Sequence, residues 1–363
     1  MKQVSLICTE CGAAAAPLDW QCAVCDGPLD FAAYPAFRGD AIVADDFSLW
    51  RYEAMLPVEK RMTLGEGLTP LVETEIEGIR FRAKLEYLNP TGSYKDRGTA
   101  TMMNHLRAHG VREVVEDSSG NAGASVAAYA SASGIHARIF VPASAAPSKK
   151  ALIAAFGGEL VEVPGSQHAK TEACLEAAKT TTYASHAWSP YFVLGQMTAA
   201  WEVWEQMRRR APDAIVAAVG HGGLFLGFAR GFRRLREAGL IEQEPRLFAI
   251  QSEGCDPIVR AIETGADVPP RVTPTQTVAD GIIVEVPVRA REVLRAIRET
   301  GGEAFRVGNE AILAARDKLL RRGLIAEPTS AVPVAALVQI RAQLGADAEI
   351  VVPLTGSGLK MLV

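Results

Sequence analysis

Lys95 lies between a turn signal and a run of residues compatible with a helix, a setting in which a lysine can act as a nucleophile. Asn89-Pro90 ends the preceding apolar run, and Gly92-Ser93 offers an N-cap before a helix expected over 99–108. The unpaired N–H groups and the dipole at the start of a helix disfavour a cation, so a desolvated lysine there gives up its proton more readily. A neutral amine of this kind is a nucleophile. The spacing alone also fits a solvated lysine that happens to follow a turn.

Two further stretches have the layout of anion-binding loops. A short strand over 114–116 runs into a loop rich in serine, glycine and asparagine, and a helix is expected over 122–133. A buried strand over 214–219 runs into Gly220-His221-Gly222-Gly223, and a helix is expected from Leu224. Glycines let backbone N–H groups approach an anion, and the helix dipole favours its charge. For the first loop, a capped helix without a ligand is the simpler alternative, and the second loop does not have the dinucleotide-binding pattern.

Four cysteines near the N-terminus form two pairs with metal-ligand spacing. Cys8 and Cys11 are followed, after ten intervening residues, by Cys22 and Cys25. Two such pairs can supply four thiolates to one tetrahedral zinc, and a site with all four positions filled is structural. Disulfides and a rubredoxin-like iron site are the alternatives. Acidic residues outnumber basic ones in this segment, which disfavours a nucleic-acid-binding role.

Residues 89–98 (Asn-Pro-Thr-Gly-Ser-Tyr-Lys-Asp-Arg-Gly) resemble the Schiff-base lysine segment of the pyridoxal-phosphate enzymes of the tryptophan synthase β-chain type. Within that superfamily the segment looks most like threonine synthase, and the resemblance extends in order from Cys8 to Lys360. It implies that Lys95 holds the coenzyme and removes the α-proton of an amino-acid substrate as general base. It also supports the zinc ribbon, because some threonine synthases carry a similar four-cysteine N-terminus.

The resemblance also implies roles for the two loops. Ser118, Ser119 and the backbone N–H of Ala122 would bind the substrate carboxylate, and Asn121 would contact the 3-hydroxyl of the coenzyme. The phosphate of the coenzyme would be bound by the glycine loop, although threonine synthases usually have asparagines at two of its positions. The implied phosphate-binding residues are Gly220, His221, Gly222, Gly223 and Leu224.

Thr355, after the last expected strand, corresponds in the family to a hydroxyl that meets the pyridine nitrogen of the coenzyme. A hydroxyl can hydrogen-bond a neutral nitrogen but cannot hold a pyridinium charge as an aspartate does. The electron sink is then weaker. This disfavours transamination and suits elimination and replacement at the β or γ carbon.

Phe192 marks a departure from threonine synthase, which tends to have a phosphate-binding arginine at this position of the Ser-Pro-Tyr-Phe run. A phosphate dianion needs charge-assisted donors. Either Arg97, Lys84 or another cation substitutes, or the substrate is not phosphohomoserine; we favour the second. His186, nearby in the sequence, could donate to a substrate, but a lone histidine is more often structural, and the sequence assigns it no catalytic role.

Alternating strands and helices between 137 and 179 predict a parallel sheet covered by helices. We therefore expect an α/β fold with two open parallel-sheet domains of the tryptophan synthase β-chain type, plus the N-terminal zinc ribbon. The expected boundaries are 1–35 for the ribbon and 100–200 for a small mobile domain. The large pyridoxal-phosphate-binding domain would comprise 36–99 and 201–363.

The composition is that of a globular protein that acts on a small molecule. The chain has 363 residues, of which 48% are apolar and 22% charged, with a net charge of −4. These values favour neither nucleic-acid nor membrane partners, since no apolar stretch reaches the roughly 20 residues that span a bilayer. The residues Met1-Lys2-Gln3-Val4 lack the form of a signal peptide, so we expect a cytoplasmic location. The resemblance implies a homodimer.

Three hypotheses of function follow. The first is a pyridoxal-phosphate-dependent lyase like threonine synthase, which would convert O-phosphohomoserine to threonine if the family reaction is kept. The second is another reaction with the same coenzyme, either serine or threonine dehydration or β-replacement on a different amino acid. The third is a non-enzymatic zinc-ribbon binding module.

Overall fold

The computed structural model describes residues 5–361, and the chain divides into two compact units. The first unit contains the chain up to Gly67 together with Asn89–Gly195. The second contains Leu68–Leu88 and the chain from Gln196 onward. Residues 1–4, on which the signal-peptide prediction rests, and residues 362–363 lie outside the described part. The functional domain boundaries given above stay a prediction.

The first unit is built on a four-stranded parallel sheet in the order β8-β7-β6-β9. Branched residues such as Val114, Val115 and Ile139 are completely buried in it, as expected of strands covered by helices. Helices α2 and α4 both pack against β7. The elements are β6 (Glu113–Glu116), β7 (His136–Pro142), β8 (Glu159–Val163), β9 (Thr182–Tyr183), α1 (Lys95–Ala108), α2 (Asn121–Ser133), α3 (Pro147–Ala155) and α4 (Gln167–Ala178).

A small antiparallel sheet carries the N-terminal cysteines of the same unit. Its order is β2-β1-β3, with β1 (Leu6–Cys8) between β2 (Ala14–Ala15) and β3 (Leu29–Phe31). Such short strands bury little apolar surface, so this sheet depends on other contacts for its stability.

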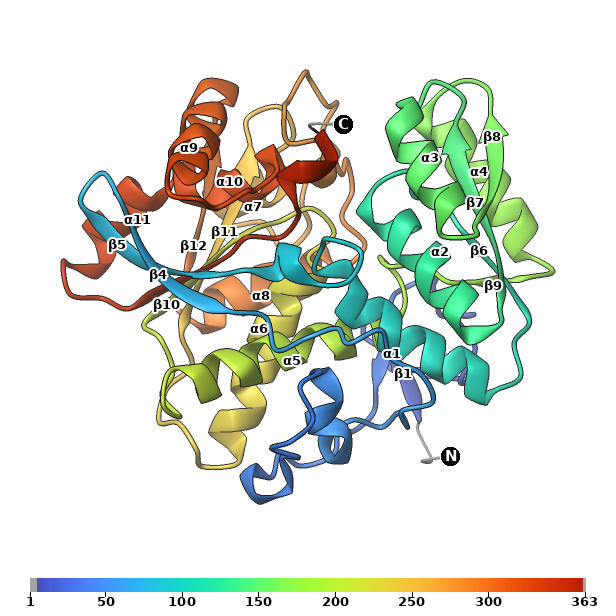
Figure 1. The fold of residues 1–363 in the computed structure, drawn as a ribbon, viewed down its shortest axis with the longest axis horizontal. Coiled ribbons are helices and arrows are strands. Elements are labelled where there is room, and N and C mark those ends of the chain that lie inside the picture. The colour runs from blue at the N-terminus through green and yellow to red at the C-terminus, as the bar shows by residue number, and fades with distance from the viewer. Residues whose placement is uncertain (1–4, 362–363) are drawn as a thin grey trace. The chain divides into compact units, whose positions relative to one another are not determined.

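The second unit is built on a six-stranded sheet in the order β12-β11-β10-β13-β5-β4. All neighbouring pairs are parallel except the β4–β5 hairpin. Helices α6 and α8 pack together, as do α9 and α10 (Figure 1). The strands are β4 (Leu71–Ile76), β5 (Ile79–Lys84), β10 (Ala214–Ala218), β11 (Arg246–Ser252), β12 (Glu303–Val307) and β13 (Ile350–Pro353). The helices are α6 (Gly223–Glu237), α7 (Pro257–Thr264), α8 (Ala290–Glu299), α9 (Asn309–Arg321), α10 (Pro328–Ala335) and α11 (Leu337–Leu344), and the boundary between the units falls within α5 (Pro190–Gln206).

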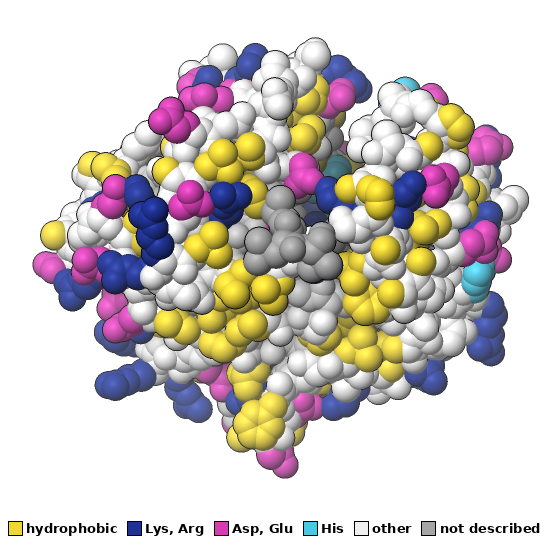
Figure 2. Space-filling model, turned by 45° about the horizontal axis from the view of Figure 1, so that its top comes forward, with side chains coloured by type: hydrophobic (Ala, Val, Ile, Leu, Met, Phe, Trp, Pro, Cys, Tyr) yellow, Lys and Arg dark blue, Asp and Glu magenta, His cyan; other side chains and the backbone are white. Residues whose placement is uncertain are grey.

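This architecture confirms the expected fold class, because two mixed α/β units each contain a mainly parallel sheet. On the face drawn in Figure 2, acidic and basic side chains are interspersed, in keeping with the small net charge. None of the helices formed by residues 5–361 is both long and apolar enough to span a lipid bilayer.

Candidate active site

Lys95 is the first residue of α1, directly after the N-cap residue Tyr94. Its Nζ lies 4.6 Å from the ring centroid of Tyr94 and 5.8 Å from that of Phe192. Gly98, one turn further along α1, packs so closely on Phe192 that an added Cβ would come within 2.6 Å of the ring. The amine is therefore held between two aromatic rings at the start of a helix.

A buried carboxylate fixes the turn that presents this lysine. Asp96 is fully buried and accepts hydrogen bonds from the Thr91 N–H at 2.6 Å, the Thr91 hydroxyl at 2.6 Å and the Ser125 hydroxyl at 2.7 Å. Ser125 belongs to α2, so Asp96 joins the lysine turn to the helix that follows the carboxylate loop. The Ser93 hydroxyl is also buried, and it has no hydrogen-bond partner within the described part of the chain.

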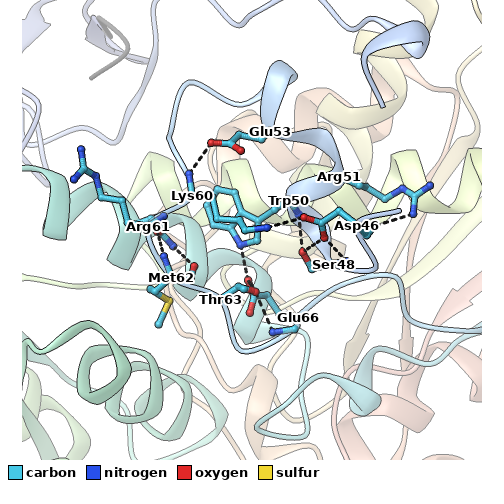
Figure 3. Close-up of polar contacts among 12 residues, drawn as sticks. Asp46, Ser48, Trp50, Arg51, Glu53, Lys60, Arg61, Met62, Thr63 and Glu66 are labelled. Carbon is cyan, nitrogen blue, oxygen red and sulfur yellow. Dashed lines mark hydrogen bonds and ion pairs between the residues drawn. The ribbon is translucent and has the colours of Figure 1, made fainter. Parts of the chain in front are cut away.

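The Gly65-Glu66-Gly67 stretch is a structural centre of the first unit. Glu66 is completely buried and accepts four hydrogen bonds, including 2.8 Å contacts from Trp50 Nε1 and the Tyr129 hydroxyl. The other two donors are the Thr63 hydroxyl at 3.0 Å and the Leu64 N–H at 2.9 Å. Figure 3 shows Trp50 and Thr63 pointing toward this carboxylate. Tyr129 lies on α2, so Glu66 ties the segment before the lysine turn to the same helix.

The predicted carboxylate loop connects β6 to α2. Ser118 and Ser119 are half-buried in it, and α2 begins at Asn121. Gly123 allows the loop to fold back, because a Cβ there would lie 1.8 Å from the Ser118 carbonyl oxygen. The N-cap residue, Gly120, has no side chain to cap this helix, and the first N–H groups of a helix, here including that of Ala122, are suited to an anion.

A charged cluster borders this loop. Asp117 accepts hydrogen bonds from the Thr171 and Tyr183 hydroxyls, each at 2.7 Å, and pairs with Lys170 at 3.2 Å. Burial alone would raise the pKa of Asp117, but Lys170 and the two hydroxyls outweigh it and lower the pKa to about 2. The carboxylate before Ser118 is thus ionised and anchored to β9 and α4.

In the second unit, the glycine loop follows β10 and leads into α6. Gly222, the N-cap residue, has a φ of +88°, and a Cβ there would lie 2.4 Å from Val293 Cγ2. Gly220 is nearly as confined, with Ile282 Cα 3.1 Å from an added Cβ. Gly222 has no side chain to cap α6, and the backbone N–H groups at a helix start are suited to an anion. Leu224 is buried and His221 is half-buried.

Thr355 follows β13, the parallel neighbour of β10, so it lies at the same edge of the sheet as the glycine loop. Its hydroxyl is 3.0 Å from the Ser330 hydroxyl, which in turn accepts the Gly356 N–H at 2.7 Å. Sequence reasoning assigned Ser330 no role, although its Pro-Thr-Ser loop signal marks the start of α10. Since parallel sheets bind ligands beyond the carboxyl ends of their strands, this edge is suited to a ring and its phosphate.

The residues present fit pyridoxal phosphate. The first unit supplies an amine at a helix start, a buried Ser93 hydroxyl and an uncapped helix. The second supplies the glycine loop, where a Cβ at Gly220 or Gly222 would meet neighbouring atoms, and the Thr355 hydroxyl after the adjacent strand. These are the groups needed for the aldehyde, the phosphate and the ring nitrogen of that coenzyme.

Lys84, one of the cations considered for a substrate phosphate, is instead committed to the core of the second unit. Its Nζ is fully buried and donates to the Thr69 carbonyl at 2.6 Å, Glu202 Oε2 at 2.7 Å and Gln206 Oε1 at 3.0 Å. Glu202 also accepts the Leu68 N–H at 2.7 Å. The amine thus has no remaining N–H for a substrate, since an ammonium offers three donors.

We expect Lys84→Met to lower the free energy of unfolding by about 3–5 kcal/mol, because it leaves Glu202 charged and buried without its counterion. Denaturant unfolding measures the change. The double variant Lys84→Met/Glu202→Leu removes both charges and is the matched control. It should recover much of the loss, and equal destabilisation by the single and double variants would contradict an ion pair that matters for stability.

The four N-terminal cysteines converge, with all Sγ atoms within 4.8 Å of one another. Neighbouring Sγ atoms are 3.4–3.6 Å apart, close to the roughly 3.8 Å expected between ligands of a tetrahedral zinc with bonds near 2.3 Å. The thiols of Cys8 and Cys22 also accept backbone N–H groups at 3.4 Å. All cysteines among the described residues are free thiols rather than disulfides. This donor set fits the predicted metal.

Comparisons with known proteins agree with this site. A family model described as a pyridoxal-phosphate dependent enzyme matches residues 62–356. The chain is 35% identical to the threonine synthase of Methanosarcina acetivorans over 98% of this chain and 92% of the relative. It is 33% identical to the threonine synthase of Methanocaldococcus jannaschii over 87% of this chain and 81% of that relative. Among solved structures, a threonine deaminase from T.th. superposes with a TM-score of 0.69 at 28% identity, covering 80% of this chain and 92% of the other.

The family model spans the lysine turn, both anion-binding loops and Thr355, and the relatives extend over most of the chain. The predicted enzyme class is confirmed: the protein is a pyridoxal-phosphate-dependent lyase related to threonine synthase. The chain belongs to the pyridoxal-phosphate-dependent enzyme family with the tryptophan synthase β-chain type of fold.

Proposed function

We propose that this enzyme eliminates the side-chain hydroxyl of a serine- or threonine-like amino acid, rather than acting on O-phosphohomoserine. Phe192 is the observation that carries the proposal. Its ring is 1% exposed and lies 5.8 Å from Lys95 Nζ. An apolar ring so close to the predicted reacting amine provides no donor for a phosphate dianion, whereas a small hydroxy amino acid needs none there.

The cations that could replace the missing arginine do not favour a phosphorylated substrate. Lys84 donates to three acceptors in the second unit. Arg97 is completely buried in α1. Lys170 is paired with Asp117 at 3.2 Å. A dianion brought beside Phe192 would have to break one of these arrangements, at a cost that its binding must overcome.

When bound, the coenzyme supplies an electron sink for the bond broken at Cα. In our proposal the chain contributes the amine of Lys95, which holds the coenzyme and takes the α-proton as general base. The substrate carboxylate is bound by Ser118, Ser119 and the N–H of Ala122. The coenzyme is oriented by Asn121 and by Thr355 at its ring, and its phosphate is bound by the N–H groups of Gly220, His221, Gly222, Gly223 and Leu224.

Threonine synthesis from O-phosphohomoserine is the second candidate. It is supported by the 35% identity to a threonine synthase over 98% of this chain. The two candidates differ in product. We expect the enzyme supplied with coenzyme to release keto acid and ammonia from threonine or serine, and to release little phosphate from O-phosphohomoserine. Phosphate release as the faster reaction would overturn the proposal.

A change at Phe192 should shift this preference. We expect Phe192→Arg to lower KM for O-phosphohomoserine by about tenfold or more, since a charge-assisted hydrogen bond contributes about 1.5–3 kcal/mol. It should also weaken turnover of threonine. Phe192→Leu keeps an apolar wall and is the matched control, with threonine still preferred. Circular dichroism and thermal unfolding establish that both variants fold. An unchanged substrate preference in a folded Phe192→Arg protein would argue against Phe192 as the residue that sets this preference.

We further propose one structural zinc on Cys8, Cys11, Cys22 and Cys25, supported by the convergence of their four sulfur atoms. The predicted cytoplasmic location and homodimer stay predictions. Size-exclusion chromatography with light scattering tests the dimer directly.

A further inference from the structure

Glu116 and His186 lie at the carboxyl ends of two adjacent parallel strands. Glu116 is the last residue of β6, and His186 follows β9 by three residues. The two strands are paired through Val115 and Tyr183, and the pairing continues to Ala184, whose N–H donates to the Val115 carbonyl at 2.9 Å. Both side chains are therefore at the edge of the sheet from which the carboxylate loop departs.

The two side chains form a buried hydrogen-bonded pair. His186 Nδ1 is 2.7 Å from Glu116 Oε1, with the carboxyl group completely buried and the histidine side chain 14% exposed. The second oxygen, Glu116 Oε2, is buried and has no hydrogen-bond partner among the residues described. A buried carboxyl oxygen without a partner is costly, so the retention of Glu116 beside the carboxylate loop calls for a role.

The pair also borders the predicted reacting centre. The His186 ring meets the Phe192 ring edge-on, with centroids 6.0 Å apart, and the Phe192 ring lies 5.8 Å from Lys95 Nζ. Lys95 influences both partners of the pair electrostatically. Asp117 and Lys170 are the other charged groups that act on them.

The hydrogen bond fixes which nitrogen of His186 carries a proton. Burial raises the pKa of Glu116 well above its usual range, while burial and the charge of Lys95 lower that of His186. A protonated Glu116 then donates to Nδ1, so the proton of the neutral ring is on Nε2. Whether the shared proton lies on Glu116 or on Nδ1, Nε2 carries a proton of its own and is a hydrogen-bond donor.

We propose that His186, oriented by Glu116, is the acid that protonates the departing hydroxyl oxygen. This assignment rests on the proposed function, because a hydroxyl leaves readily only as water. Lys95 takes the proton from Cα. The bond between Cβ and oxygen breaks with its electron pair going to oxygen, which takes the Nε2 proton and departs as water. The proton of Glu116 then moves to Nδ1. At this point the Glu116–His186 pair has lost one proton and Lys95 has gained one, so the return of one proton restores the pair.

Two substrates that differ in leaving group test the proposal. Serine loses a hydroxyl that must be protonated, whereas β-chloroalanine loses chloride, which needs no proton. In the enzyme supplied with coenzyme, we expect His186→Gln to lower kcat on serine or threonine by about 10²-fold or more. Elimination of chloride should be nearly unchanged. His105→Gln is the control, since His105 is also buried but its Nε2 bonds to the Pro17 carbonyl; it should change stability without changing the ratio of the two rates.

A readout that does not depend on turnover tests the part played by Glu116. In protein labelled with ¹⁵N-imidazole histidine, the His186 signals, identified by their loss in His186→Gln, should show a protonated Nε2. Glu116→Gln can still donate an amide hydrogen to Nδ1 and should keep this tautomer and most of the serine activity. Glu116→Ala cannot, and should lose both in part.

The outcomes separate this inference from the proposed function. If the native enzyme releases chloride from β-chloroalanine but no keto acid from serine or threonine, the proposed function is wrong, and this role of His186 is wrong with it. Suppose instead that the native enzyme acts on the hydroxy amino acids. If His186→Gln then slows the reactions of serine and β-chloroalanine equally, or slows neither, only the role of His186 is overturned. An Nε2 without a proton in the native protein would have the same meaning.

Discussion

Lys95→Ala protein that is incubated with excess pyridoxal phosphate and then desalted should be colourless, while native protein treated in the same way should be yellow. The side chain removed is the amine predicted to bond the coenzyme. Lys84 and Lys170 are not ready substitutes, because each is paired with an acidic residue. Loss of the general base alone lowers the rate by about 10²- to 10⁴-fold, and loss of the bond to the coenzyme adds to this. Absorbance spectra and rates of keto-acid release with saturating coenzyme measure both effects.

Stability distinguishes this effect from misfolding. The Lys95 amine lies over two aromatic rings, contacts that contribute about 0.5–2 kcal/mol at most. The coenzyme-free variant should therefore unfold close to the native coenzyme-free protein. Lys150→Ala is the matched control, since Lys150 belongs to the same unit and pairs on the surface with Glu162. A yellow and active Lys95→Ala protein would overturn the assignment of the reacting amine.

The lysine turn shows how far local sequence signals reach. The turn residues were predicted, and so was the position of Lys95 in the first turn of the helix, but the helix-compatible run was counted only from residue 99, with Gly92-Ser93 as its cap. The helix begins four residues earlier, at Lys95. The difference comes from Asp96, which closes the turn by accepting the Thr91 N–H and joins it to Ser125 on another helix. Such a tertiary contact carries no local signal, so the boundary was the least predictable part.

The C-terminal region gives a second example. The apolar face of residues 330–344, taken from the sequence alone, predicts a single helix, whereas the structure has α10 and α11, which meet at Ala336. The Ala336 N–H bonds to the Pro333 carbonyl three residues back, which closes the first helix. Pro333 itself lacks an N–H, so the ladder of hydrogen bonds is already weakened there. Periodicity reports which face is buried but not where a helix bends.

The buried ionic groups were the main omission. Lys84 and Glu202 are 118 positions apart, and Glu116 and His186 are 70 apart. Nothing in the local pattern distinguishes these residues from solvated charges. The motifs that were found carry glycines and hydroxyls at fixed spacing, which local chemistry can explain. Long-range polar pairs appear only when the sheet order brings their strands together, as β6 and β9 do for Glu116 and His186.

Removal of the proposed N-terminal zinc should lower the melting temperature of the protein and loosen the packing beside the predicted carboxylate loop. Trp20 lies between the two cysteine pairs, and its ring packs edge-on against Tyr183 and Trp188, each with centroids 5.2 Å away. In the same segment, the Pro17 carbonyl accepts the 2.8 Å hydrogen bond of His105 Nε2. The metal would therefore hold a loop that packs on α1 and β9 of the same unit. Tyr183 in turn bonds Asp117, the residue before the predicted carboxylate loop.

The expected effect is large because three short strands cannot hold this segment alone. Structural zinc sites in isolated fingers contribute about 10–16 kcal/mol to folding, and part of such a contribution should appear here as a lower melting temperature. Cys22→Ser, or exhaustive chelation, should remove one zinc per chain by metal analysis and shift the fluorescence of Trp20 to that of a more solvated indole. Cys174→Ala is the control: it creates a small cavity in the same unit but leaves the metal ligands intact, so the zinc content should stay at one. A chelated protein with native stability and fluorescence would mean that the docking contacts of Pro17 and Trp20 are sufficient and that the metal is dispensable for the fold.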